Sequence, residues 1–151
     1  MPSPTYGLDT PTQISGRLLC FDFGLRRIGV AVGQTVTNTA TPVTVILASD
    51  GTPNWDDIKR LLQEWRPKAI VVGIPIDMLD QETEITLAAI RFGLQLKEQT
   101  QLPVYGMNER LSSEAAKERI IEHGGLRKVP KQGIDAISAQ IILEDWLHEY
   151  N

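Results

Sequence analysis

A short, wholly apolar run in the middle of the chain restricts the fold most strongly. Residues 69–72 read Ala-Ile-Val-Val, after Pro67 and before Gly73 and Pro75. A strand without polar alternation is typical of a parallel sheet that helices cover on both faces. Because helical patterns lie on either side of this run in the sequence, we expect an α/β fold in which helices flank a sheet.

Three further strand patterns precede this run. Residues 17–23 and 27–32 are apolar and are separated by a short glycine-containing loop, which predicts a β-hairpin. Residues 41–47 are rich in β-branched side chains and predict a third strand. Residues 50–53 read Asp-Gly-Thr-Pro, which is typical of a loop.

Helical periodicity and its stop signals divide the remainder of the chain. The predicted elements are a helix from Thr52 or Asn54 to Pro67, a long helix over 82–99, a strand over 103–107, a helix from Ser112 to near His123, and a last helix from Gly133 to about His148.

The domain boundary is predicted near residue 16. Residues 1–15 are rich in Pro, Thr and Ser, so we expect a flexible tail outside a single domain over 16–151. No secretory signal pattern and no run of ~20 apolar residues is present, which excludes a membrane partner. Cys20 is the sole cysteine, which excludes an intrachain disulfide and favours a cytoplasmic protein.

Three carboxylates, far apart in the sequence, fall where this fold would bring them to one edge of the sheet. Asp22 ends the first strand, Glu109 follows a later strand, and Asp135 opens the last helix. Ligands of such sheets bind beyond the carboxyl ends of the strands. Three converging carboxylates repel one another unless a cation lies between them, and Mg²⁺ or Mn²⁺ prefers oxygen ligands. The pattern therefore predicts a metal-dependent hydrolase of phosphodiesters in which these acids are both metal ligands and catalytic residues.

Basic side chains adjoin each of these acids. We expect them to hold phosphate oxygens, for which arginine is well suited, although each is also explained as a solvated loop charge. The net charge of −4 argues against tight, non-specific binding of nucleic acid. The candidate nucleic-acid contacts are Arg26, Arg27, Arg110, Arg127, Lys128 and Lys131.

Four segments carry a family resemblance, namely Asp-Phe-Gly-Leu-Arg-Arg-Ile-Gly-Val-Ala at 22–31, Val-Val-Gly-Ile-Pro at 71–75, Asn-Glu-Arg-Leu-Ser at 108–112, and Ile-Asp-Ala-Ile-Ser-Ala-Gln-Ile-Ile-Leu at 134–143. In this order they resemble the bacterial YqgF/RuvX family. The resemblance implies a ribonuclease H-like α/β fold, with a five-stranded mixed sheet whose second strand is antiparallel, flanked by helices. It also implies that the acids at 22, 109 and 135 are the functional ones. Asn108 departs from the family, which usually has Asp there.

The resemblance implies a nuclease that matures the 5′ end of 16S ribosomal RNA or resolves Holliday junctions in branched DNA, and we favour the RNA substrate. Symmetric junction cleavage calls for a dimer, and we expect a monomer or a weak homodimer. A non-catalytic nucleic-acid-binding module is the rival of another class, because Asn108 removes a charge. An ATP-using protein of the actin and sugar-kinase fold shares the Asp-x-Gly pattern, but it needs two domains.

Overall fold

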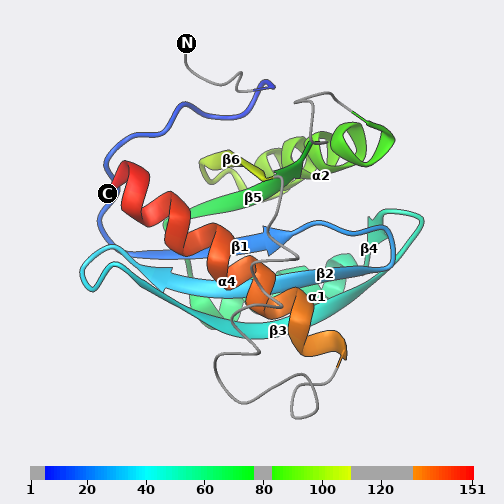
Figure 1. Cartoon of the computed structure of the whole chain (residues 1–151), viewed down its shortest axis with the longest axis horizontal. Coiled ribbons are helices and arrows are strands. Elements are labelled where there is room, and N and C mark those ends of the chain that lie inside the picture. The colour runs from blue at the N-terminus through cyan, green and yellow to red at the C-terminus, as the bar shows by residue number, and fades with distance from the viewer. Residues whose placement is uncertain (1–5, 77–82, 110–130) are drawn as a thin grey trace.

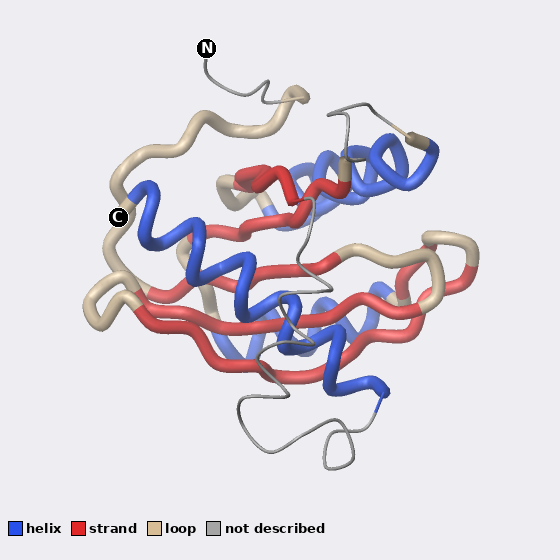
Figure 2. Tube along the Cα trace, viewed as in Figure 1, coloured by secondary structure: helices blue, strands red, loops and turns tan. Residues whose placement is uncertain are grey.

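The computed structural model describes residues 6–76, 83–109 and 131–151, except for the side chains of 131 and 132. In this part of the chain, one six-stranded sheet has the order β4-β3-β2-β1-β5-β6 and carries helices on both faces (Figures 1 and 2). The elements are β1 (Arg17–Asp22), β2 (Arg27–Gln34), β3 (Thr39–Ser49), β4 (Thr52–Pro53), α1 (Trp55–Trp65), β5 (Ala69–Pro75), α2 (Glu84–Thr100), β6 (Val104–Glu109) and α4 (Lys131–Tyr150).

The sheet is mixed, and β1 lies inside it. β1 pairs antiparallel with β2 and parallel with β5, while β5 pairs parallel with β6. The ribonuclease H-like fold with an antiparallel second strand is therefore confirmed. Because β1 has a partner on each side, its last residue, Asp22, lies opposite both Gly29 and Gly73.

One strand was not predicted. The five expected strands are present, but the two-residue β4 adds a sixth by pairing with the end of β3. Residues 50–53 were expected to form a loop throughout. Asp50 and Gly51 instead make a tight turn with positive φ angles of 49° and 83°, which brings Thr52 back opposite Ser49. A turn of this kind needs a residue that tolerates the left-handed region, and glycine does so without a Cβ penalty.

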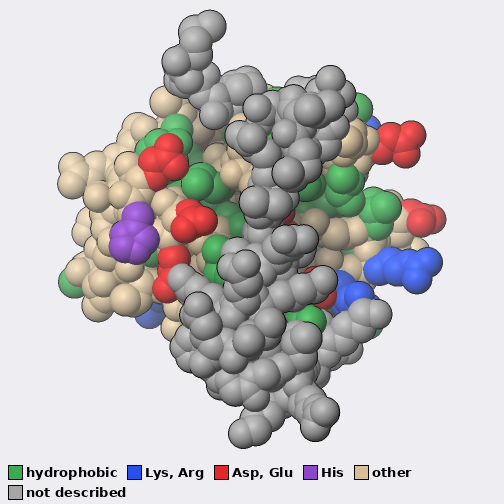
Figure 3. All heavy atoms as spheres, viewed as in Figure 1, with side chains coloured by type: hydrophobic (Ala, Val, Ile, Leu, Met, Phe, Trp, Pro, Cys, Tyr) green, Lys and Arg blue, Asp and Glu red, His purple; other side chains and the backbone are tan. Residues whose placement is uncertain are grey.

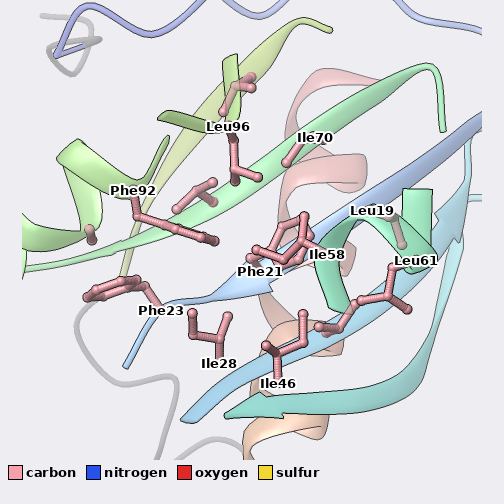
Figure 4. Packing of buried hydrophobic residues seen from close by; sticks show 14 of the residues in the cluster. Leu19, Phe21, Phe23, Ile28, Ile46, Ile58, Leu61, Ile70, Phe92 and Leu96 are labelled. Carbon is pink, nitrogen blue, oxygen red and sulfur yellow. The ribbon is translucent and has the colours of Figure 1, made fainter. Parts of the chain in front are cut away.

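Each face of the sheet buries its own apolar cluster. In β1, Leu19 and Phe21 point to the side covered by α1 and α2, where Phe21 packs edge-on against Phe92 (Figure 4). The alternate residues Leu18 and Cys20 point to the opposite side and pack against α4. Figure 1 shows α4 crossing this second face from one end of the sheet to the other.

The helix boundaries follow the capping chemistry closely. Asn54 caps α1, as predicted, by accepting the N–H of Asp56 at 3.1 Å. Thr83 caps α2 in a reciprocal capping box with Thr86, whose hydroxyl also donates to the carbonyl of Pro75 at the end of β5. The helix predicted from residue 112 to 123 lies outside the described residues. No helix in the described ranges has the length and apolarity needed to cross a membrane.

The N-terminal segment differs from the predicted tail. Leu8 is only 5% exposed and belongs to the core on the α2 side. Asp9 bonds to Val104 twice, through its own N–H to the carbonyl and through Oδ2 to the N–H, both at 2.9 Å. Asp9 also forms an ion pair with Lys97 at 3.1 Å. The expectation of a tail outside the fold is thus wrong for this stretch, because composition alone did not reveal two anchoring side chains.

Replacement of Leu8 with Ala should therefore lower the free energy of unfolding by about 2–3 kcal/mol, since it removes a buried aliphatic side chain and leaves a cavity. Val36 is 83% exposed, so Val36→Ala is a matched control that should change stability by less than about 0.5 kcal/mol. Urea denaturation followed by circular dichroism measures both. Equal small effects would mean that the segment does not pack in solution.

Candidate active site

Strand alternation places the predicted acids on one face of the sheet. Asp22 lies two residues beyond Cys20, and Glu109 lies four residues beyond Tyr105. Both Cys20 and Tyr105 pack in the cluster under α4, so both acids have the parity of the α4 side. Asp135 comes from α4 itself. The three acids therefore approach one region from two strands and a helix.

Two glycines leave the space for this approach. Gly29 and Gly73 are the direct neighbours of Asp22 on the flanking strands. A Cβ on Gly29 would overlap the backbone carbonyl oxygen of Asp135, and a Cβ on Gly73 would lie 2.7 Å from Cδ1 of Ile142 and 3.3 Å from Cδ of Glu109. The backbone of one acid and the carboxyl of another thus lie against the strands on either side of Asp22.

The charges of the three acids act on one another. Burial raises the pKa of Asp22 well above its usual range, and the charge of Glu109, a side-chain hydrogen bond with Glu109 and the charge of Asp135 raise it further. The pKa of the Cys20 thiol is raised well above its usual value by burial first, and then by the charges of Asp22 and Glu109. Burial and the neighbouring charges therefore favour the neutral forms of both the Cys20 thiol and the Asp22 carboxyl when no cation is bound.

Of the six predicted phosphate contacts, only two have side chains in the described part of the chain. Arg27 forms an ion pair with Asp135, with Nε 3.1 Å from Oδ2. The neighbouring Arg26 is exposed at the hairpin loop, and its carbonyl accepts the N–H of Ala48 at 2.8 Å. Arg110, Arg127 and Lys128, together with the side chain of Lys131, lie outside the described residues.

Two predicted boundaries near the acids were wrong by a small margin. Glu109 is the last residue of β6 and does not follow the strand, because β6 continues two residues past the expected end at 107. Asp135 is the fifth residue of α4, which begins at Lys131 and not at 133. Glu109 and Asp135 therefore both lie within regular secondary structure, where the backbone hydrogen bonds restrict the direction of their side chains.

Asn108, where the family usually has Asp, lies beside Glu109 in β6. Since successive strand residues point to opposite faces, the side chain at 108 has the parity of the α2 side, away from the acids. The change from Asp to Asn therefore removes no carboxylate from this region. Sequence reasoning missed the role of Gly73, although this glycine belongs to the Val-Val-Gly-Ile-Pro segment at 71–75; only the strand pairing in the structure places it opposite Asp22.

The donor chemistry of the acids fits a hard divalent cation. All three offer carboxylate oxygens, and such a cation would offset the repulsion that raises the pKa of Asp22. Within the described ranges, however, no group of three or more Asp, Glu, His or Cys side chains is arranged so that it could hold a metal ion. Figure 3 shows Lys or Arg beside Asp or Glu side chains at the end of this face toward which β1 runs.

The sequence matches one family model and several proteins that are named as nucleases. The model of the family described as "RuvX: Holliday junction resolvase" matches residues 16–149. A protein of Aeromonas hydrophila subsp. hydrophila named "Putative pre-16S rRNA nuclease" is 46% identical over 135 residues, which cover 89% of this chain and 96% of that one. A protein with the same name from Legionella pneumophila (strain Lens) is 45% identical over 134 residues, with 89% and 96% covered.

Among solved structures, the fowlpox virus resolvase in complex with substrate Holliday junction DNA matches with a TM-score of 0.53. The sequence identity is 11%, and the match covers 88% of this chain and 97% of the viral one. A second structure of the fowlpox virus Holliday junction resolvase has a TM-score of 0.52 at 14% identity, with 88% and 99% covered. At these identities the likeness shows the shared fold.

The close approach at Gly29 yields a prediction. Gly29→Ala should destabilise the protein by about 3 kcal/mol or more, because the added Cβ meets backbone atoms of α4 that cannot rotate away. Gly106→Ala is the matched control in a strand, since its Cβ would meet only side-chain carbons of Ile74 and Leu8 at 3.2 Å. Thermal unfolding compares the two. A Gly29→Ala protein as stable as the control would contradict the packing of α4 on β2.

The raised pKa of Asp22 yields a second prediction, for the metal-free protein. A carboxyl whose pKa is raised by folding contributes stability below its ordinary pKa of about 4, and this contribution is lost as the pH rises through the raised value. Asp22→Asn, which cannot ionise, should therefore be more stable than wild type at pH 7 by about 1 kcal/mol, or ~2–4 °C in Tm.

The difference between wild type and Asp22→Asn should vanish near pH 3–4, where both side chains are neutral. Melting curves in EDTA from pH 3 to 8 measure it. A variant that is less stable than wild type at neutral pH would show that Asp22 is not repelled by its neighbours.

Proposed function

Because the chain belongs to the RuvX family and is a nuclease, we propose that it hydrolyses phosphodiester bonds with a divalent cation held by Asp22, Glu109 and Asp135, and that its substrate is the precursor of 16S ribosomal RNA. One observation carries this proposal. The two glycines opposite Asp22 lie against the backbone of Asp135 and the carboxyl of Glu109, so the three acids meet at the end of a central strand and repel one another, which also raises the pKa of Asp22. Such repulsion is relieved by a cation.

The position of each residue in the fold suggests its role in binding the cation or the substrate. Asp22 is on β1, which is paired on both sides, and it lies between the other two acids, so it is the candidate for the central ligand. Glu109 from β6 and Asp135 from α4 would be the other two ligands of the cation. When bound, Mg²⁺ or Mn²⁺ supplies a water of lowered pKa and neutralises charge on the scissile phosphate. The exposed Arg26 would contact phosphate oxygens next to the site.

The choice of substrate rests on sequence similarity. Relatives that are 45–46% identical over nearly their whole length are named for pre-16S rRNA. Holliday junction resolution is the second candidate, and the description of the matching family favours it. The position of Asn108 supports catalysis over a mere binding role, because its side chain has the parity of the face opposite the acids.

The test compares wild type with Asp22→Asn on two substrates in Mg²⁺, a 16S precursor with its 5′ leader and a four-way DNA junction. We expect the wild type to cleave the RNA and the variant to be at least ~100-fold slower, since a central metal ligand is lost. Asp57→Asn, on α1 at the opposite face of the sheet, is the matched control and should cleave as wild type does.

The outcomes separate the candidates. Equal cleavage by Asp22→Asn and wild type would remove Asp22 from the mechanism. Cleavage of the junction with the RNA left intact would assign the second candidate function. A titration with Mn²⁺ identifies a pure binding module, which should bind nucleic acid without any metal requirement and should not respond to loss of Asp22.

A further inference from the structure

Arg27, which was predicted to contact phosphate, pairs with one of the three acids in the structure. Its Nε lies 3.1 Å from Oδ2 of Asp135, and the two side chains are 34% and 32% exposed. Two ion pairs elsewhere in the described part of the chain, Arg60 with Asp57 on α1 and Lys97 with Asp9 at the end of α2, lie away from the cluster of Asp22, Glu109 and Asp135. Arg27 therefore contributes a guanidinium group that contacts this cluster through Asp135.

Backbone packing holds this ion pair in place. Arg27 is two residues before Gly29 on β2 and has the same strand parity, so its side chain leaves the sheet on the α4 side. The backbone carbonyl of Asp135 packs against Gly29 itself. Because the backbones of α4 and β2 are in contact at this point, they bring the guanidinium of Arg27 and the carboxylate of Asp135 together.

We propose that Arg27 is an internal counter-ion of Asp135 that competes with the divalent cation for this carboxylate. The inference rests on the proposed metal-dependent function and concerns how its site is regulated. In the metal-free protein the guanidinium offsets one of the three negative charges. When a cation binds, Arg27 gives up Asp135 and becomes available to a phosphate oxygen of the substrate. Arg27 thus couples metal binding to substrate binding.

Two physical points support an exchange. A pair that is about one third exposed loses little when it separates, since water reaches both partners. A divalent cation within a few ångströms of a guanidinium is also strongly repelled by it. Arg27 therefore lowers the metal affinity of the site while it stabilises the metal-free state. A residue that only positions Asp135 for metal would have the opposite effect on affinity.

The first experiment measures Mn²⁺ binding by calorimetry without nucleic acid, for wild type, Arg27→Gln and Arg27→Lys. Arg27→Gln should bind Mn²⁺ roughly five- to tenfold more tightly, because a repelling charge is gone, and Arg27→Lys should stay within about twofold of wild type. Arg60→Gln is the matched control, since it breaks an arginine–aspartate pair on the far face and should leave the Kd unchanged. Unchanged or weaker binding by Arg27→Gln overturns the proposal.

The second experiment needs no variant and so does not depend on whether Arg27→Gln folds. The Nε–H resonance of Arg27 is followed by NMR in wild type while Mg²⁺ is added. It should move toward the position of a solvated arginine with the same midpoint as metal binding. A resonance that does not move overturns the proposal.

The two proposals fail in different ways. If wild type shows no Mn²⁺ binding that depends on Asp22, the metal-dependent function and the role of Arg27 both fall. If Mn²⁺ binds in an Asp22-dependent way but Arg27→Gln does not tighten it, only the role of Arg27 falls.

Discussion

The site depends on glycine at positions 29 and 73, because a residue with a side chain would not leave room there. A strand that lies between two partners normally carries side chains on all three strands at each level of the sheet. Here Asp22 has a glycine on each side. The space is taken by the backbone of α4 over Gly29, and by the side chain of Ile142 together with the carboxyl of Glu109 over Gly73. The fold thereby turns a level of the sheet that would otherwise be core into a meeting point of acids.

The site and the core share one face of the sheet. Under α4 the same strands carry Cys20 and Tyr105, and Tyr105 stacks on Trp146 with ring centroids 5.2 Å apart. Next to this apolar layer, burial is the largest cause of the raised pKa of Asp22, and the charges of Glu109 and Asp135 add to it. The free energy of packing in the surrounding core therefore offsets the unfavourable free energy of placing three carboxylates close together.

The periodic parts of the fold could be predicted from the sequence. The hairpin, the apolar run at β5 and the buried face of α2 follow from local patterns, and Asp22 was expected at the end of its strand because the apolar residues stop there. Asn54 was identifiable as a cap by its chemistry. These features depend on residues close together in the chain.

Other features depend on tertiary contacts that no local pattern encodes. The burial of Leu8 and the pairing of Asp9 need a groove made by α2 and β6, distant in sequence. The partner of Arg27 follows only from the approach of α4 to β2, 108 residues apart at the hydrogen bond. The composition of the N-terminal stretch predicted a flexible tail, whereas Leu8 is buried in the core. The position of Arg27 in the chain did not reveal that its side chain pairs with Asp135.

The two hydrogen bonds between Asp9 and Val104 matter when the chain is shortened at its N-terminus. Among the described strands β6 is at the edge of the sheet, and the peptide groups of an edge strand can pair with a strand of another molecule. Asp9 occupies two of those groups near the start of β6. A shortened chain that begins at Arg17 would expose them, together with the apolar hollow left by Leu8, and would be prone to self-association and loss of solubility before any defect in its chemistry could be measured.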